Sequence, residues 1–210
     1  MKKAKILFFD VGYTLINEDD VWIDRCRKQA ATAEARERGL TYHRIYQEIV
    51  IASIGHKPPY RTAMQKLGLT DVVPYSSALE KLYPYTIPVL DNLAQKYRLG
   101  IIANQAHGLQ QRLKQEGIAH YFSVVVSSAD CGAAKPEPKI FELALQRAQC
   151  APHEAVMIGD RLDNDIYPAK KLGMKTIWVR QGFVGMQSIF KDDYRPTTQI
   201  ALLSELNTIL

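Results

Sequence analysis

The sequence has few cysteines and no long apolar run. Its three cysteines, Cys26, Cys131 and Cys150, are an odd number without a paired spacing. This argues against a disulfide framework or a zinc site and is typical of a reducing compartment. The apolar run Ile6–Phe9 lies close to two N-terminal lysines, as in a signal peptide, but Asp10 interrupts it. No stretch is long enough to cross a bilayer, so we expect a cytoplasmic protein with no membrane partner.

Blocks of one charge are also missing. The sequence has 27 Lys and Arg against 22 Asp and Glu, a formal charge of +5, without a basic stripe interleaved with aromatic residues. We therefore expect no nucleic-acid partner. Hydrophobic residues make up 47% and charged residues 23% of the 210 positions, which is ordinary for a globular protein. This length allows one large domain, or a core with a modest insertion. Nothing in the sequence indicates an oligomeric state.

Short apolar runs bounded by turn residues alternate with amphipathic stretches of helical spacing. Because the runs are continuous rather than alternating, they predict strands that are buried on both faces of a parallel sheet. The predicted strands are Ile6–Phe9, Leu99–Ala103, Val124–Val126, Ala155–Ile158 and Thr176–Val179. The predicted helices of this part are Ile87–Tyr97, Leu109–Gln115, Lys139–Gln149, Asp163–Leu172 and a final one at Ile200–Leu210. This order predicts the α/β class, with a doubly wound parallel sheet.

The first two predicted strands are separated by much more chain than one crossover helix needs. Residues 17–84 read as helical, with breaks at Pro58, Pro59 and Gly68. We interpret them as a small all-helical cap domain, and residues 1–16 and 85–210 as the α/β core domain. Val184–Tyr194 is expected to be an irregular excursion of the core.

Polar residues follow the predicted strands at the points where ligands bind in open α/β sheets. Asp10 and Thr14 follow the first strand, Lys135 comes after the third, and Gly159-Asp160 and Asn164-Asp165 follow the fourth. Taken singly, the acids would be turn or helix-capping residues and the lysine a surface residue. Their order, each after a strand, instead predicts a divalent-cation site with one carboxylate left to act as a nucleophile.

This ordered set resembles the haloacid dehalogenase (HAD) superfamily. Its signature is an Asp-x-Asp-x-Thr-Leu loop, a Ser or Thr after the second strand, a lysine, and a Gly-Asp-x-x-x-Asn-Asp loop. The resemblance runs from Asp10 through Asp165 to the C-terminal segment, and the long insertion after the first motif is similar to the helical cap of that superfamily's first cap class.

The resemblance implies a mechanism and a role for each matching residue. Asp10 would attack phosphorus to form an aspartyl-phosphate, with Lys135 neutralising a phosphoryl oxygen and keeping Asp10 ionised. Mg²⁺ would be held by oxygen ligands. These ligands would be Asp10, the main-chain carbonyl of Gly12 and Asp160, with Asp165 completing the shell directly or through water.

The remaining matching residues have supporting parts. Asn104 and Thr14 would lie at the phosphate site, although Thr14 is expected to bond within its own loop first. Asn164 and Gly159 would shape the acidic loop. The expected substrate is a small phosphorylated molecule.

Two positions depart from the superfamily pattern. Gly12 stands where phosphatase members have the aspartate that protonates the leaving group, and loss of such a group costs about 10²–10⁴ in rate. Ala103 stands where the pattern has Ser or Thr, which removes a hydrogen bond to a charged group worth roughly 1.5–3 kcal/mol. If the chain is active, it should favour leaving groups that need little protonation.

Several residues and functions stay open from the sequence. His107 or Tyr13 could replace the missing acid, or they could be a surface loop histidine and a packing residue. Arg61 could contact substrate from the cap, or be a solvated loop residue. Besides a Mg²⁺-dependent phosphohydrolase, the sequence allows a catalytically impaired phosphate-binding or interaction protein. It also allows a metal-independent haloacid dehalogenase that attacks carbon with the same aspartate.

Overall fold

The computed structural model describes residues 4–210, which form two compact units. The core unit comprises the described residues through Ile16, Leu82–Gln181 and Ile189–Leu210. The helical unit comprises Asn17–Lys81 and Gly182–Ser188. The second segment of the helical unit lies far along the chain and overlaps the excursion Val184–Tyr194, which was expected to belong to the core.

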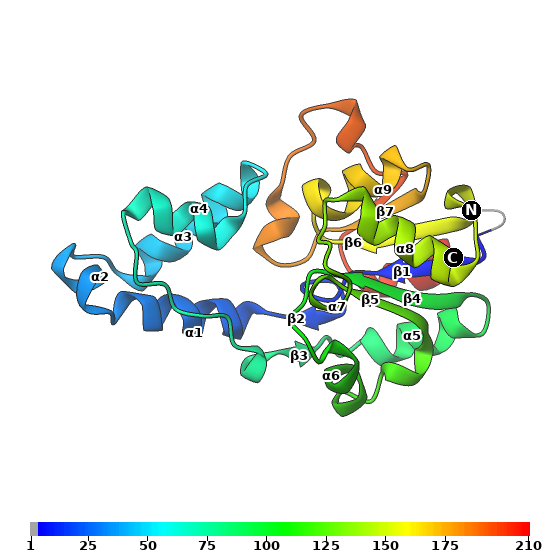
Figure 1. The fold of residues 1–210 in the computed structure, drawn as a ribbon, viewed down its shortest axis with the longest axis horizontal. Coiled ribbons are helices and arrows are strands. Elements are labelled where there is room, and N and C mark those ends of the chain that lie inside the picture. The colour runs from blue at the N-terminus through cyan, green and yellow to red at the C-terminus, as the bar shows by residue number, and fades with distance from the viewer. Residues whose placement is uncertain (1–3) are drawn as a thin grey trace. The chain divides into compact units, whose positions relative to one another are not determined.

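The core unit is built on a six-stranded parallel sheet, in the order β5-β4-β1-β6-β7-β8 (Figure 1). The strands are β1 (Ile6–Phe9), β4 (Arg98–Ala103), β5 (Phe122–Ser127), β6 (Ala155–Gly159), β7 (Lys175–Val179) and β8 (Thr198–Ile200). The helices are α5 (Thr86–Ala94), α6 (Leu109–Gln115), α7 (Ser128–Cys131), α8 (Pro138–Ala148), α9 (Tyr167–Lys171) and α10 (Leu206–Ile209).

The strand order puts β1 between β4 and β6. After β1 the chain adds β4 and β5 on one side of β1 within the sheet, and then β6, β7 and β8 on the opposite side. In register, Phe9 at the end of β1 faces Ile101 of β4 and Ile158 of β6. Such a reversal point is where the carboxyl ends of parallel strands leave room for a ligand. The residues that follow β1, β4 and β6 are therefore brought to one edge of the sheet.

The sheet is buried on both faces because successive side chains of each strand point to opposite sides. In β1, Leu7 and Phe9 pack in one apolar cluster with residues of α5, α6 and α10. Ile6 and Phe8 pack in a second cluster with residues of α8 and α9. Burial of each such side chain is worth roughly 1.5–3 kcal/mol, so the strand that carries Asp10 is held from both sides.

The helical unit contains four α-helices. They are α1 (Asp19–Ala30), α2 (Ala33–Glu37), α3 (Tyr42–Ile54) and α4 (Pro59–Leu67). Thr41 caps α3 through its side chain, and Gly68 ends α4 in a left-handed conformation. Where the chain passes between the units, β2 (Ile16–Asn17) and β3 (Lys81–Leu82) pair as a two-stranded sheet.

The predicted fold class is confirmed, and the five predicted strands lie within one or two residues of β1, β4, β5, β6 and β7. The predicted helix Ile200–Leu210 is wrong over its first half. Ile200 is the last residue of an additional strand, β8, which pairs with β7. The carbonyl oxygen of Ile200 accepts a hydrogen bond from the amide of Arg180. The Glu205 carboxylate then accepts from the amides of Ala201 and Leu202, which starts a 3₁₀ turn, and only Leu206–Ile209 is α-helical.

Within residues 4–210, no helix is both long enough and apolar enough to cross a membrane.

The absence of a side chain at Gly100 is required by packing. A Cβ at this position would lie 2.7 Å from two ring carbons of Phe8, in the middle of the sheet. We expect Gly100→Ala to lower the free energy of unfolding by about 1–3 kcal/mol, because the buried strand has no room to move. Chemical denaturation measures the effect. Gly55→Ala, whose Cβ would meet its neighbours at an ordinary 3.4 Å, is the control and should change stability by less than about 1 kcal/mol. Equal effects of the two substitutions would contradict the packing argument.

Candidate active site

The loop after β1 is a tight turn that fixes Asp10. The Asp10 amide continues the sheet by donating to Ile158 O at 2.9 Å. Val11 O then accepts from the amides of Leu15 and Ile16 at 2.9 and 3.1 Å. Tyr13 takes a positive φ of 48°, and its carbonyl accepts from Gln181 Nε2 at 2.9 Å. The carboxylate thus projects from a loop that is anchored at both ends.

Lys135 contacts two of the predicted acids. Its side chain is 2% exposed, and Nζ donates to Asp10 Oδ1 at 2.6 Å and to Asp165 Oδ1 at 2.5 Å. Burial alone would lower the pKa of Lys135, but the facing carboxylates of Asp10 and Asp165 outweigh it and raise that pKa above its ordinary value. The ammonium therefore stays charged between the two acids.

Asn104, which follows β4, positions this lysine. Its Nδ2 donates to Lys135 O at 2.8 Å, and its Oδ1 accepts from Lys135 N at 2.7 Å. The sequence predicted a contact of this amide with phosphate. In the structure its donor and acceptor atoms both hold the main chain of Lys135, while the contact with phosphate stays a prediction.

The acidic loop after β6 places Asp160 and Asp165. The chain makes a π-helical turn over Leu162–Ile166, in which Arg161 N donates to Asp165 Oδ2 at 3.0 Å. A Cβ on Gly159 would lie 2.5 Å from Asp165 Cγ. Only glycine at this position therefore lets the Asp165 carboxylate pack directly against the end of β6. Trp178 Nε1 donates to Asp160 O at 2.8 Å and fixes the start of the loop.

Three carboxylates gather at this edge of the sheet. Asp10, Asp160 and Asp165 each offer an oxygen, and these oxygens all lie within 4.8 Å of one another. Burial, followed by the charges of Asp10 and Asp165, raises the pKa of Asp160 well above its usual range. Burial likewise raises the pKa of Asp165 to about 6, against the opposing effect of Lys135. One ammonium does not balance three carboxylates, so the site carries an excess of negative charge.

A divalent cation fits this arrangement. Asp160 Oδ1 is buried and has no hydrogen-bond partner among residues 4–210. A buried carboxylate oxygen without a partner is costly, and hard cations take oxygen ligands from such carboxylates. The three acids can therefore hold a metal ion, whereas a contact with the carbonyl of Gly12 stays a prediction.

The structure places other predicted residues as follows. Thr14 is completely buried, and its hydroxyl has no hydrogen-bond partner among the described residues, so the expected side-chain bond within its own loop is not made. Asn164 lies half-buried in the π-helical turn. Ala103 is buried at the end of β4 within an apolar cluster. Roles for Thr14 and Asn164 in catalysis stay predictions.

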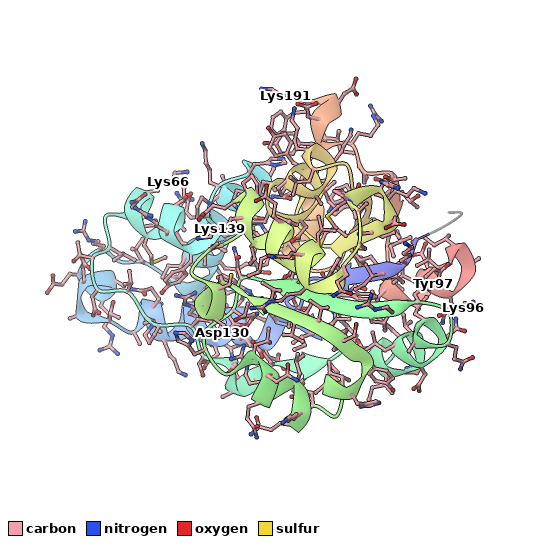
Figure 2. The ribbon with its side chains drawn as sticks, turned by 45° about the vertical axis from the view of Figure 1, so that its right-hand side comes forward. Lys66, Lys96, Tyr97, Asp130, Lys139 and Lys191 are labelled. Atoms are coloured by element: carbon pink, nitrogen blue, oxygen red, sulfur yellow. The ribbon has the colours of Figure 1, made fainter. Side chains whose placement is uncertain are left out.

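The candidate replacements for the missing acid differ in their surroundings. Tyr13 is 2% exposed, in keeping with a packing residue. His107 is exposed, and its Nδ1 lies 2.8 Å from Oδ1 of Asp130, a surface residue visible in Figure 2. Arg61 is an exposed residue of α4.

Sequence reasoning missed Gln181, which is 4% exposed. Besides donating to Tyr13 O, its side chain accepts from Leu203 N at 2.7 Å and from Tyr85 Oη at 3.0 Å. This glutamine, which follows β7, thus joins the Asp10 loop to Tyr85 and to the 3₁₀ turn that begins at Leu203. The one signal in the sequence was its place after a strand, like the other site residues.

Comparison with known proteins agrees with this geometry. The sequence profile of the family described as haloacid dehalogenase-like hydrolase matches residues 7–179. The chain belongs to the haloacid dehalogenase-like hydrolases. It is 32% identical to a glyceraldehyde 3-phosphate phosphatase of Methanopyrus kandleri, over 96% of this chain and 95% of that protein. It is 33% identical to the enzyme of that name from Methanocaldococcus jannaschii, over 85% of this chain and 86% of the relative.

Solved structures of this family share the fold. A HAD phosphatase from Thermococcus onnurineus superposes with a TM-score of 0.67 and 28% identity, covering 98% of this chain and 97% of that one. The putative HAD-hydrolase YfnB from Bacillus subtilis, solved with bound magnesium, superposes with a TM-score of 0.71 at 22% identity, covering 100% and 99%. The predicted family and the assignment as an enzyme of the hydrolase class are confirmed.

Asn104 offers a direct test of how the lysine is held. Asn104→Ala leaves the amide and carbonyl of Lys135 without their partners, and we expect a loss of about 1–3 kcal/mol in the free energy of unfolding. Asn207→Ala, which removes a single exposed side-chain hydrogen bond to Asn92, is the control and should cost less than about 1 kcal/mol. Urea denaturation compares the two. A cost for Asn104→Ala no larger than the control would argue against the positioning role.

Substitution of Asp160 tests whether the three carboxylates give the site an excess of negative charge. Without divalent ions at pH 7, we expect Asp160→Asn to raise stability by about 1–3 kcal/mol, because burial and two neighbouring acids disfavour ionisation of Asp160 in the folded chain, and the neutral amide carries no such cost. Thermal melts in EDTA measure this gain, and adding millimolar Mg²⁺ should raise the Tm of the unmodified chain but not of the variant.

Asp163→Asn is the matched control for this loop. Asp163 pairs with Arg161 and lies outside the group of three carboxylates, so its variant should keep the Mg²⁺-dependent rise in Tm. A rise that survives Asp160→Asn, or is lost in Asp163→Asn, would show that the ion binds elsewhere.

Proposed function

We propose that this chain is a Mg²⁺-dependent phosphohydrolase that acts on a small phosphorylated metabolite through an aspartyl-phosphate on Asp10. The observation that carries the proposal is the buried Lys135 ammonium, which bonds Asp10 and Asp165 at 2.6 and 2.5 Å beside a third carboxylate. A fixed nucleophile, a cation for phosphoryl oxygens and an oxygen-rich metal site are the parts that phosphoryl transfer requires.

Each residue has a defined task in the proposed reaction. Lys135 bonds Oδ1 of Asp10, so we assign Oδ2 as the atom that attacks phosphorus while the ester P–O bond breaks. The leaving group departs as the alkoxide and takes a proton from solvent water, since Gly12 supplies no acid. A second water then hydrolyses the acyl phosphate to inorganic phosphate and the free carboxylate. Lys135 stabilises negative charge on the phosphoryl oxygens throughout.

Mg²⁺ would be held by Asp10, Asp160 and Asp165, and when bound it would supply positive charge against the phosphoryl group. The grouping of the three acids and the magnesium-bound Bacillus subtilis relative support this choice of ion.

The named relatives point to a substrate class. Two proteins that match most of this chain are called glyceraldehyde 3-phosphate phosphatase, and they support a small phosphorylated sugar, such as glyceraldehyde 3-phosphate, as the substrate. We propose this class for the present chain.

The function is tested by phosphate release from glyceraldehyde 3-phosphate, p-nitrophenyl phosphate and acetyl phosphate, with Mg²⁺ or with EDTA. We expect metal-dependent release that Asp10→Asn abolishes. If a folded protein that binds Mg²⁺ releases no phosphate from any of them, the chain is a non-catalytic relative. Activity on a 2-haloacid that persists in EDTA would instead identify a dehalogenase.

Gly12 generates a prediction about leaving groups. Because this position has no acid to protonate the departing oxygen, we expect kcat/KM for p-nitrophenyl phosphate and acetyl phosphate to exceed that for an alkyl phosphate of similar size. The ratio should be about 10²–10⁴, the usual contribution of a positioned acid. Comparable values for aryl and alkyl phosphates would indicate a substitute acid. In that case an altered pH–rate profile in His107→Gln would implicate the histidine, and an unchanged profile would exclude it.

A further inference from the structure

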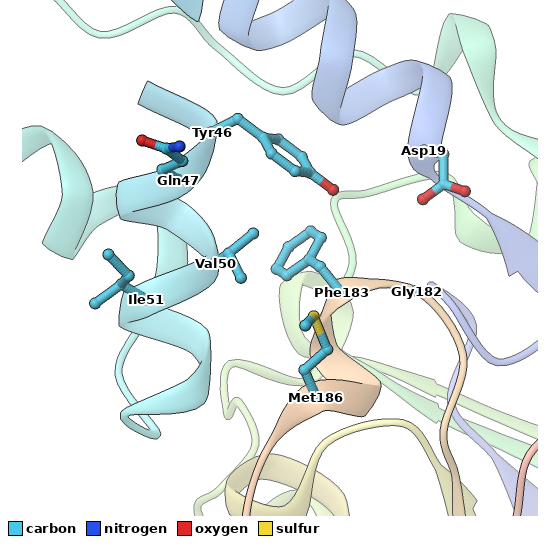
Figure 3. A pocket seen from close by; sticks show the side chains of 8 residues that line it. All are labelled: Asp19, Tyr46, Gln47, Val50, Ile51, Gly182, Phe183 and Met186. Atoms are coloured by element: carbon cyan, nitrogen blue, oxygen red, sulfur yellow. The ribbon is translucent and has the colours of Figure 1, made fainter. Parts of the chain in front are cut away.

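The helical unit contains a pocket whose lining includes none of the residues assigned to the proposed chemistry. It has a volume of about 690 Å³ and is lined by residues of α1 and α3 and by the segment that begins at Gly182 (Figure 3). The lining residues are Asp19, Tyr46, Gln47, Val50, Ile51, Gly182, Phe183 and Met186. A volume of this size is in the range of small-molecule sites.

The pocket is apolar and partly open. Phe183 is 5% exposed, and its ring meets that of Tyr46 edge to face, with centroids 5.9 Å apart. Ile51 and Met186 are 52% and 57% exposed, which is unfavourable for large apolar side chains in the same pocket. A ligand with an apolar body would cover this surface.

The pocket also has a definite charge. Among the residues that line it, Asp19 carries the one formal charge, and none is basic. Burial, and after it the Asp19 carboxylate, raises the pKa of Tyr46, so the negative charge acts on the phenol (Figure 3). The π faces of two aromatic rings add further negative potential. Anionic groups are therefore disfavoured here.

We propose that this pocket binds an organic ammonium group carried on an apolar body of about the size of one aromatic ring. The rings of Tyr46 and Phe183 attract the cation and pack against the apolar part, while the Asp19 carboxylate pairs with the ammonium. The inference is independent of the proposed hydrolysis, because it concerns binding to the helical unit alone.

The test uses three probes of similar shape that differ in charge: 2-phenylethylamine, 2-phenylethanol and 3-phenylpropionate. Their dissociation constants for the full chain are measured at pH 7 by ligand-observed NMR. We expect the ammonium to bind about tenfold more tightly than the alcohol, in keeping with a cation–π contact together with a partly exposed ion pair, and the carboxylate to bind most weakly.

Two surface substitutions locate the site. Asp19→Asn should reduce the preference for the ammonium over the alcohol to less than about threefold, whereas Asp24→Asn, which lies on the same helix outside the lining, should leave it unchanged. Met186→Lys puts a cation at the exposed rim and should abolish ammonium binding. Both positions are exposed, so these variants should fold, which circular dichroism verifies.

The binding measurements decide the proposal without any assay of phosphatase activity. Preference for the ammonium that depends on Asp19 and is lost in Met186→Lys supports it. Equal binding of the three probes, no saturable binding at millimolar concentration, or a preference that survives Asp19→Asn overturns it. The binding measurements do not use phosphate release, so the proposed function is tested separately.

Discussion

The site depends on one ammonium group that lies among three carboxylates, of which Asp160 and Asp165 are buried and Asp10 is partly exposed. Lys135 bonds Asp10 and Asp165 at 2.6 and 2.5 Å, and Asp160 lies within reach of both acids. Without that cation, the repulsion among the acids would keep the loops after β1 and β6 apart. With it, a net negative charge remains, which is the condition for drawing in a divalent ion.

Much of the surrounding fold serves to hold that ammonium in place. Asn104 fixes the main chain of Lys135, Gly159 makes room for the carboxylate of Asp165, and Trp178 anchors the acidic loop through Asp160 O. Gln181 performs the same task for the loop of Asp10. The residues that orient Lys135, the acidic loop and the Asp10 loop come from β6 and β7 and from the segments after β4 and β7.

The features predicted from the sequence were those that show as a local pattern, namely the strands and the acids that follow them. The strands were visible as apolar runs, and Asp10, Asp160, Asp165 and Lys135 could be chosen because each follows a strand. The structure brings these four together. Strand β8 was missed because its three residues carry too little pattern, and the final helix was overextended because nothing local shows that Glu205 caps a turn.

Residues that act through long-range contacts were harder to predict. The role of Gln181 depends on partners at Tyr13, Tyr85 and Leu203, and no local pattern specifies contacts across such distances in the chain. The place of Asn104 after a predicted strand was visible in the sequence, but its attachment to Lys135 depends on the path of the chain between β5 and α8. Gly182–Ser188 likewise gave no sign that it packs with helices more than a hundred residues earlier.

That last segment changes how the protein can be engineered. Because Phe183 packs against Trp22 and Tyr46, and Gln187 donates to Ser53 O, the helical unit is assembled from two separate pieces of chain. A chimaera that exchanges residues 17–81 alone would pair foreign helices with a native Gly182–Ser188 segment and leave their contact mismatched. A chimaera between two relatives should therefore exchange both pieces together. A deletion of residues 17–81 would leave the apolar side chains of Gly182–Ser188 exposed to water.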